Sequence, residues 1–173
     1  MLFRFVPPAL SKLDDLDTEI LVASVHTDVR PARGVAGLCD FRMGGRISRL
    51  LRDGFVTGEV GEVVMMPGKP MLAFDKLLLF GAGPADAFDA RLFSKLVQSI
   101  FSRLAKLRTR VAAVELPGRA QGVISPNDAA RALLDQAELA PEWDSWILVE
   151  PVEARGVFES AIAERRRRLR REI

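Results

Sequence analysis

The sequence predicts a three-layer α/β/α domain in which a central mixed, mostly parallel sheet lies between helices. Apolar, β-branched runs alternate along the chain with segments of helical periodicity, and this alternation is typical of parallel sheets covered by helices. The run at 76–83 has no polar residue after its first lysine, which suits a strand buried on both faces. A chain of 173 residues is long enough for one domain with a substantial core.

Short apolar runs predict the strands of this sheet. The alternating run LFRFV at 2–6 is predicted to be an edge strand because Pro7 and Pro8 end it. Longer and more continuous apolar runs predict buried strands; they lie at 19–26, 60–66, 76–83, 110–117 and 146–151.

Four segments with apolar residues at helical spacing predict helices. They lie at 35–52, which Gly44 and Gly45 interrupt, at 90–107, at 125–139, and from Glu153 to residue 172. The third carries its own start signal, because the Ser125 side chain can accept from a free helix amide, Pro126 suits the first helical position and Asp128 favours the positive end of the helix dipole. We expect one domain over 1–152, with the helix of 153–173 packed on it or extending from it.

Composition excludes several classes of function. The net charge is only +2, so no global field favours nucleic acid. A single cysteine, Cys39, excludes an internal disulfide and a cysteine-based metal cage, and its apolar neighbours predict a buried, inert thiol. We find no signal peptide and no apolar run long enough to span a bilayer, so a cytoplasmic location without membrane contact is expected.

Residues that could carry catalysis are scarce. His26 is the only histidine, and the sequence places it at the end of a strand, where an ordinary structural role is expected. The carboxylates are scattered, and those between Asp14 and Asp17 are typical of a solvated turn. We therefore predict no catalytic residue, no metal site and no cofactor.

A succession of short motifs points to a known family. The segment that begins at Val35 reads VAGLCDFRMGGRISRLLRDGFVTGEVGEVVMMP, and LLLFGAG follows at 77–83. This order of a Gly-Arg-Ile-Ser helix turn, a Gly-Glu strand entry and a Gly-rich strand end resembles the N-terminal, non-catalytic domain of the leucyl aminopeptidase (cytosol aminopeptidase) family. The resemblance implies a macro-domain-like fold. The family's later Asn-Thr-Asp-x-Glu-Gly-Arg metal-binding segment has no counterpart here, so we expect no peptidase activity.

Two glycine loops are similar to the ligand loops of macro domains, which often bind ADP-ribose. Gly122 and Val123 match the macro phosphate loop, whereas Ile124 replaces its aromatic residue and Ser125 its second glycine. Glycines let backbone amides approach phosphate oxygens, and a following helix N-terminus adds positive charge. The resemblance implies two ligand-binding loops, whose residues are Gly81, Gly83, Gly122, Val123 and Ser125. The alternative is that these glycines only allow tight turns between strands and helices.

Arginines form two further candidate sites. Arg42 and Arg46 flank the Gly44–Gly45 pair, where they could contact an anion or serve a structural role by pairing with a nearby carboxylate. The C-terminal run offers a second set, which could bind an acidic partner or be a solvated interdomain helix; it comprises Arg165, Arg166, Arg167, Arg168, Arg170 and Arg171. Nucleic acid is the least favoured partner because no aromatic residues alternate with these arginines.

Three functions follow from these features. The first is a stand-alone, non-catalytic interaction or regulatory module that acts through a protein partner or self-association. The alternative is macro-like binding of ADP-ribose or a related nucleotide. A second alternative is a DNA-binding accessory protein that uses the arginine-rich tail.

Overall fold

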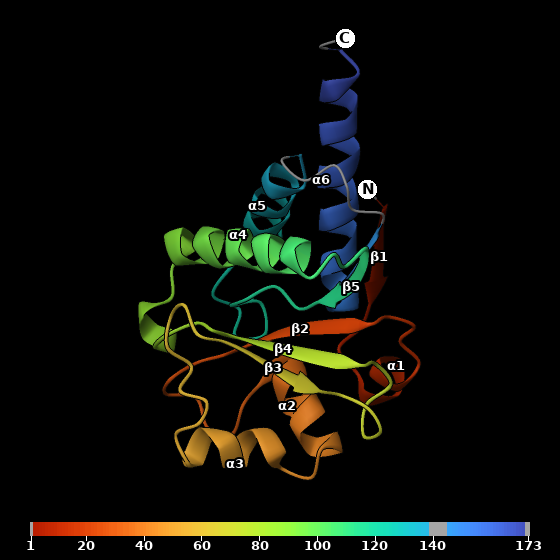
Figure 1. The fold of residues 1–173 in the computed structure, drawn as a ribbon. Coiled ribbons are helices and arrows are strands. Elements are labelled where there is room, and N and C mark those ends of the chain that lie inside the picture. The colour runs from red at the N-terminus through yellow and green to blue at the C-terminus, as the bar shows by residue number, and fades with distance from the viewer. Residues whose placement is uncertain (1, 139–144, 172–173) are drawn as a thin grey trace.

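The computed structural model of this chain describes residues 2–138 and 145–171 (Figure 1). The strands within these residues are β1 (Leu2–Val6), β2 (Ile20–Val25), β3 (Val63–Pro67), β4 (Lys76–Gly81), β5 (Val111–Val114) and β6 (Ser145–Val149). The helices are α1 (Leu10–Asp14), α2 (Gly34–Arg42), α3 (Arg46–Arg52), α4 (Ala90–Lys106), α5 (Pro126–Glu138) and α6 (Val152–Leu169), with a short 3₁₀ helix η1 (Ala85–Ala87) before α4.

The strands form one mixed sheet in the order β1-β6-β5-β2-β4-β3. All neighbouring strands are parallel except β3, which runs antiparallel to β4. The prediction of a mixed, mostly parallel sheet with the first strand at its edge is therefore confirmed.

Helices cover both faces of this sheet, as predicted. Figure 1 shows α4, α5 and α6 on one face and α2 and α3 on the other. The side chains of β2 are all buried and serve both layers. Ile20 and Val22 pack in the core under α4 and α5, whereas Leu21 and Ala23 pack in the core with α2 and α3. Strand alternation thus divides one apolar run between two cores.

The predicted helix at 35–52 is two helices, α2 and α3, which separate at the glycine pair. Gly44 and Gly45 have φ angles of 62° and 79°, values that glycine adopts without the steric cost of a side chain. Asp40, near the end of α2, then caps α3, because its carboxylate accepts from the N–H of Ile47 at 2.7 Å and of Ser48 at 3.1 Å. The chain therefore turns sharply without leaving the first amides of α3 unpaired.

Side-chain caps also begin two of the helices on the other face, α4 and α5. Asp89 accepts from the N–H of Leu92 at 2.8 Å at the start of α4. At the start of α5, the Ser125 hydroxyl accepts from the N–H of Asp128 at 3.1 Å, which confirms the predicted start signal. The amphipathic face predicted for 90–107 is buried over the sheet, where Phe101 stacks on Trp146 with ring centroids 4.3 Å apart.

Each remaining predicted element has a counterpart, but its ends shift by a few residues. Strand 60–66 begins only at Val63, and strands 76–83, 110–117 and 146–151 all end earlier than predicted. Ala82, Glu115 and Glu150, which follow these strands directly, each still donate one backbone hydrogen bond to a neighbouring strand. α1 was not predicted, because its five residues are too few to show helical periodicity. The predicted helix ends at Leu139 and Glu172 lie outside the described residues. No helix in the described part of the chain is long and apolar enough to cross a membrane.

Candidate functional site

The carboxyl ends of the parallel strands meet at one edge of the sheet, which we call the carboxyl edge. In open α/β sheets this is the edge where ligands bind. β2 is followed there by His26, β4 by Ala82 and Gly83, β5 by Glu115 and β6 by Glu150. The loops after these strands contain the predicted glycine sites.

The glycines that end β4 make backbone contacts with the loop before β3. The N–H of Gly81 donates to the carbonyl of Glu62 at 2.9 Å, and the N–H of Gly83 donates to the carbonyl of Gly58 at 2.8 Å. A Cβ on Gly81 would lie 1.9 Å from the carbonyl oxygen of Glu59, so only glycine fits there. Both predicted ligand amides are therefore already bonded within the protein.

His26 lies beside the end of β4 at the carboxyl edge. Its Nδ1 lies 3.0 Å from the carbonyl oxygen of Gly83, and its ring meets Phe88 edge-on with centroids 5.6 Å apart. Its Nε2 is buried without a hydrogen-bond partner among the described residues. Phe88 and Ile124 are also buried, so apolar side chains and a ring fill the space beside the second predicted loop.

That second loop, between β5 and α5, is more open. Gly122 and Val123 are exposed, although the N–H of Gly122 donates to the carbonyl of Arg119 and that of Val123 to the carbonyl of Gly118. Ser125 uses its hydroxyl group as the cap of α5. The structure brings Gly122, Val123 and Ser125 together at the surface, but the N–H groups of the first two and the hydroxyl group of Ser125 bond to the chain itself.

Buried charged residues, which the sequence analysis did not single out, occupy the centre of the carboxyl edge. The carboxylate oxygens of Glu115 accept from the N–H of Val35, at the start of α2, at 3.0 and 3.1 Å. Burial raises the pKa of the Glu115 carboxyl group to about 8, and the nearby charge of Glu150 adds to this rise, whereas the bond from Val35 lowers the pKa. Glu115 is therefore largely protonated at neutral pH.

Glu150 and Arg119 form a buried ion pair beside Glu115. Arg119 donates from Nε at 3.0 Å and from Nη2 at 2.8 Å to the Glu150 carboxylate, and from Nη1 to the carbonyl of Ile124 at 2.6 Å. Burial raises the pKa of Glu150, while the hydrogen bonds and charge of Arg119 oppose that rise. The pair fixes the β5–α5 loop to the end of β6.

A cavity of about 320 Å³ opens next to these charges. Its polar lining residues are Glu115 and Arg119, and its apolar ones are Pro8, Gly34, Leu38, Ala120, Val149 and Pro151. We call it the edge cavity. The sequence contains a signal for this cavity, because a glutamate directly follows a buried apolar run in both VAAVE and WILVE. The prediction from the glycine loops placed the ligand site at other residues of the same edge.

The predicted anion pair of Arg42 and Arg46 lies on the opposite layer. Arg42 pairs with Asp14, with Nε 3.0 Å from Oδ1. Arg46 is exposed at the first position of α3. The cysteine of this layer, Cys39, is 1% exposed, and burial raises its pKa to about 12, which confirms the predicted inert thiol.

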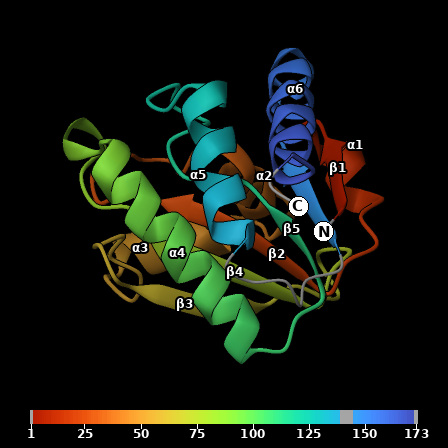
Figure 2. The same ribbon diagram turned by 90° about the horizontal axis from the view of Figure 1, so that it is seen from above.

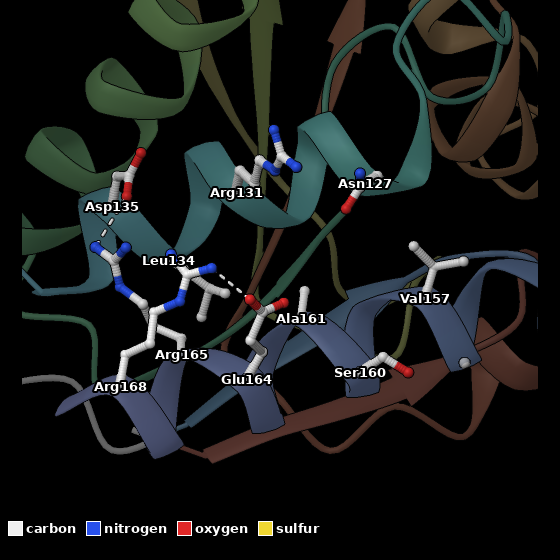
Figure 3. Close-up of a pocket in the computed structure, with 11 residues that line it drawn as sticks. Asn127, Arg131, Leu134, Asp135, Val157, Ser160, Ala161, Glu164, Arg165 and Arg168 are labelled. Atoms are coloured by element: carbon white, nitrogen blue, oxygen red, sulfur yellow. Dashed lines mark hydrogen bonds and ion pairs between the residues drawn. The ribbon is translucent and has the colours of Figure 1, made fainter. Parts of the chain in front are cut away.

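A larger groove, of about 810 Å³, lies between α5 and α6. Figure 3 shows Asn127 and Arg131 on α5 at one side of the groove and Ser160, Glu164 and Arg168 on α6 at the other, with the guanidinium group of Arg131 pointing away from α6. The remaining lining residues are Leu134, Asp135, Gly156, Val157, Ala161 and Arg165. We call it the α5/α6 groove. It brings two of the predicted tail arginines into a recess.

The tail arginines differ in their surroundings. Arg165 lies 3.1 Å from Asp135 of α5, and Arg168 pairs with Glu164 one helical turn earlier. The end of α6 extends away from the domain (Figure 1), and the residues from Arg166 to Arg171 are all exposed. The described residues contain no group of three or more histidine, cysteine, aspartate or glutamate side chains that could hold a metal ion.

Comparison with known families finds one match that covers most of the chain. Residues 26–141 match the N-terminal domain of the cytosol aminopeptidase family. The cytosol aminopeptidase of Pseudomonas aeruginosa is 32% identical over 103 residues, which is 60% of this chain and 21% of that protein. The probable cytosol aminopeptidase of Pseudomonas syringae is 30% identical over the same length. The chain thus spans about a fifth of the length of these curated relatives.

Solved structures share the fold. A Trypanosoma brucei macrodomain in complex with ADP-ribose superposes with a TM-score of 0.69 at 18% identity, covering 92% of this chain and 68% of that one. The macrodomain of Mycobacterium tuberculosis DarG superposes with a TM-score of 0.65 at 18% identity, covering 86% of this chain and 97% of that one. A tomato leucine aminopeptidase mutant gives 0.62 at 14% identity, covering 93% of this chain and 35% of that one. The expected macro-domain-like fold is confirmed.

Proposed function

This chain belongs to the cytosol aminopeptidase family through its N-terminal domain, and from that premise we propose that it is a non-catalytic interaction module for an acidic protein segment. The α5/α6 groove is the proposed contact surface. The observation that carries the proposal is a recess of about 810 Å³ with three arginines beside an arginine-rich helix end. A cytoplasmic location is part of the same proposal, because the relatives are named as cytosol proteins.

The groove suits a polypeptide in shape. Its walls are two helices, one of which, α6, continues past the domain as an exposed surface (Figure 1). Leu134, Val157 and Ala161 supply apolar surface in the lining, and Asn127 and Ser160 supply neutral hydrogen-bonding groups. A bound segment would therefore find both apolar and polar contacts along the recess.

The charges of the groove favour an acidic occupant. Three guanidinium groups line it against two carboxylates, those of Asp135 and Glu164. Both carboxylates are already engaged by Arg165 and Arg168. Arg131 is exposed on α5 and has no acidic partner among the described residues. Because arginine pairs with carboxylates through two parallel hydrogen bonds, Arg131 is the natural first contact for a glutamate-rich segment.

A labelled glutamate-rich peptide tests this proposal by fluorescence anisotropy. We expect saturable binding by the wild-type protein that weakens as salt is added. The double variant Arg131→Glu/Arg168→Glu should lose at least about tenfold in affinity, which corresponds to about 1.4 kcal/mol. Arg49→Glu/Arg52→Glu is the control matched in charge, because Arg49 and Arg52 are exposed on α3 in the opposite helical layer, and it should bind as the wild type does.

Three results would contradict the proposal. They are no binding by the wild type, equal losses in the control and in Arg131→Glu/Arg168→Glu, and displacement of the peptide by mixed-sequence duplex DNA at a lower concentration than by unlabelled peptide. The last would support the DNA-binding alternative, whose affinity should fall steeply with salt.

A second candidate function is nucleotide binding in the edge cavity. The cavity lies at the carboxyl ends of β5 and β6, where open α/β sheets take ligands, and a structural neighbour is described in complex with ADP-ribose. Isothermal titration with ADP-ribose should then give saturable heat that Ala120→Trp, which fills the cavity, abolishes. Val123→Trp, on the same loop but outside the lining, should retain it. Absence of heat from the wild type at millimolar ligand would reject this function.

A further inference from the structure

The outer edge of the sheet at β3 is an unpaired strand. β3 is the last strand in the sheet order and pairs only with β4. Figure 2 places it at the border of the molecule, with no described helix or strand beyond it. Met65, at the middle of β3, is 54% exposed. Such an edge offers its free N–H and C=O groups to another strand.

The register identifies which backbone groups of β3 are free. The N–H of Gly81 bonds to the carbonyl of Glu62, and the N–H of Gly68 bonds to the carbonyl of Asp75. Antiparallel hydrogen bonds alternate along a strand, so the even-numbered residues from 62 to 68 point their backbone groups at β4. Val63, Met65 and Pro67 therefore point theirs outward, and Pro67 has no N–H to leave unpaired there.

β3 lacks the charged side chains that often protect an edge strand, although Pro67 removes one free N–H at its end. Its sequence VVMMP contains no charged residue, whereas β1, at the other edge, carries the exposed Arg4. Charged side chains on edge strands discourage pairing with further chains. Val60 and Met71, in the loops at either end of β3, are also exposed, at 50% and 55%. Exposed apolar surface therefore runs along this edge.

We propose that β3 pairs antiparallel with β3 of a second copy of this chain, about a two-fold axis at Met65. In this arrangement the two Met65 residues exchange N–H···O=C bonds across the axis. The N–H of each Val63 donates to the carbonyl of Pro67 in the other copy. The sheet would then continue from one molecule into the next, through an interface that uses the same surface twice.

The ends of the strand are complementary under this axis. Glu59 is exposed in the turn before β3, which the N–H of Glu62 closes on the carbonyl of Glu59. Lys69 is exposed two residues after β3, with 63% of its side chain accessible while it contacts Asp75. Antiparallel pairing brings the acidic end of one copy to the basic end of the other. It also brings Val60 toward Pro70 and Met71 of the second copy, so apolar surface meets apolar surface. These matches favour a second copy over an unrelated strand.

Cross-linking and light scattering test the pairing on the full chain. We expect multi-angle light scattering to give twice the monomer mass for the wild type, and the monomer mass for Met65→Lys, which places two like charges face to face. Opposed residues in such a pair have Cα atoms about 5.5 Å apart, within the range of about 4.4–6.8 Å that a disulfide spans. Met65→Cys should therefore form a reducible, disulfide-linked dimer on mild oxidation.

The chain supplies its own controls. Cys39 is buried, so the wild type should not cross-link. Val152, 69% exposed at the start of α6, is the matched position, and Val152→Lys should remain dimeric while Val152→Cys fails to cross-link. A monomeric wild type at its highest soluble concentration, or a dimer that survives Met65→Lys, would overturn the proposal. The α5/α6 groove takes no part in this pairing, so failure here leaves the peptide-binding result unchanged.

Discussion

Glu115 shows how the fold sets the chemistry of a single residue. The residue is 6% exposed, and its carboxyl group accepts only the N–H of Val35 among the described residues. Removal from water disfavours the charged form. The pKa of Glu115 is raised from 4.5 to about 8, so the folded state holds a proton that the unfolded state releases in mildly acidic solution.

The pH dependence of stability should reveal this proton. The pKa of Glu115 is higher in the folded state than in the unfolded state. The stabilisation that Glu115 adds to the free energy of unfolding is therefore fully present below about pH 4.5 and is lost as the pH rises toward about 8. Between these two values, the free energy of unfolding should fall by up to about 1.4 kcal/mol per pH unit. Glu115→Gln, which stays neutral and keeps one acceptor for Val35, should remove it. Urea unfolding of both proteins between pH 5 and 8 measures the difference.

Comparison of the two proteins separates Glu115 from its neighbours. Glu150 also has a raised pKa, but it titrates in both proteins and cancels in the comparison. We expect the variant to gain stability relative to the wild type as the pH rises. A constant difference across this range would show that Glu115 is ionised in the folded protein.

At the scale of an element, α6 is attached to the domain by very few side chains. Ala154 and Phe158 are its only buried residues among those described. Phe158 is fully buried and meets the ring of Phe5 edge-on, with centroids 5.9 Å apart. The second half of α6 projects beyond the sheet (Figure 1). The second half also contacts α5 through the ion pair of Arg165 with Asp135, but a surface ion pair contributes little, so α6 depends mainly on Phe158 for its position.

Phe158→Ala should therefore release α6 as well as destabilise the domain. Truncation of a buried phenylalanine costs about 3–5 kcal/mol. We expect faster tryptic cleavage at the arginines that follow Arg165, measured by mass spectrometry under native conditions. Val157→Ala is the control, because Val157 is 38% exposed beside Phe158. If both variants are cleaved at the wild-type rate, Phe158 is not what holds the helix.

At the scale of the whole molecule, the two cores share the central strands. Leu78 packs under α4 and α5, and its neighbour Leu79 packs with α2 and α3. Both side chains are buried. Loss of either core would therefore expose one face of the same strand, so neither layer of helices can stay packed once the other is lost.

We accordingly expect the domain to unfold in one cooperative step. Leu78→Ala and Leu79→Ala should each lower the free energy of unfolding by about 2–5 kcal/mol. In both variants the transition should coincide when followed by far-UV circular dichroism and by tryptophan fluorescence. Separate transitions in either variant would show that the two layers unfold independently.

The sequence by itself determined the order and type of nearly all elements, because apolar runs, helical spacing and caps act within a few residues. The Ser125 start signal and the buried run at 76–83 are local in this sense. The tertiary structure decided what the carboxyl edge contains. Glu115 meets Val35 across 80 residues, and Arg119 meets Glu150 across 31, whereas the amides of Gly81 and Gly83 are occupied by the loop before β3. Such partners are fixed only when distant strands align in the sheet, so a local pattern such as VAAVE or WILVE can place a glutamate at a strand end but cannot predict which residue it contacts.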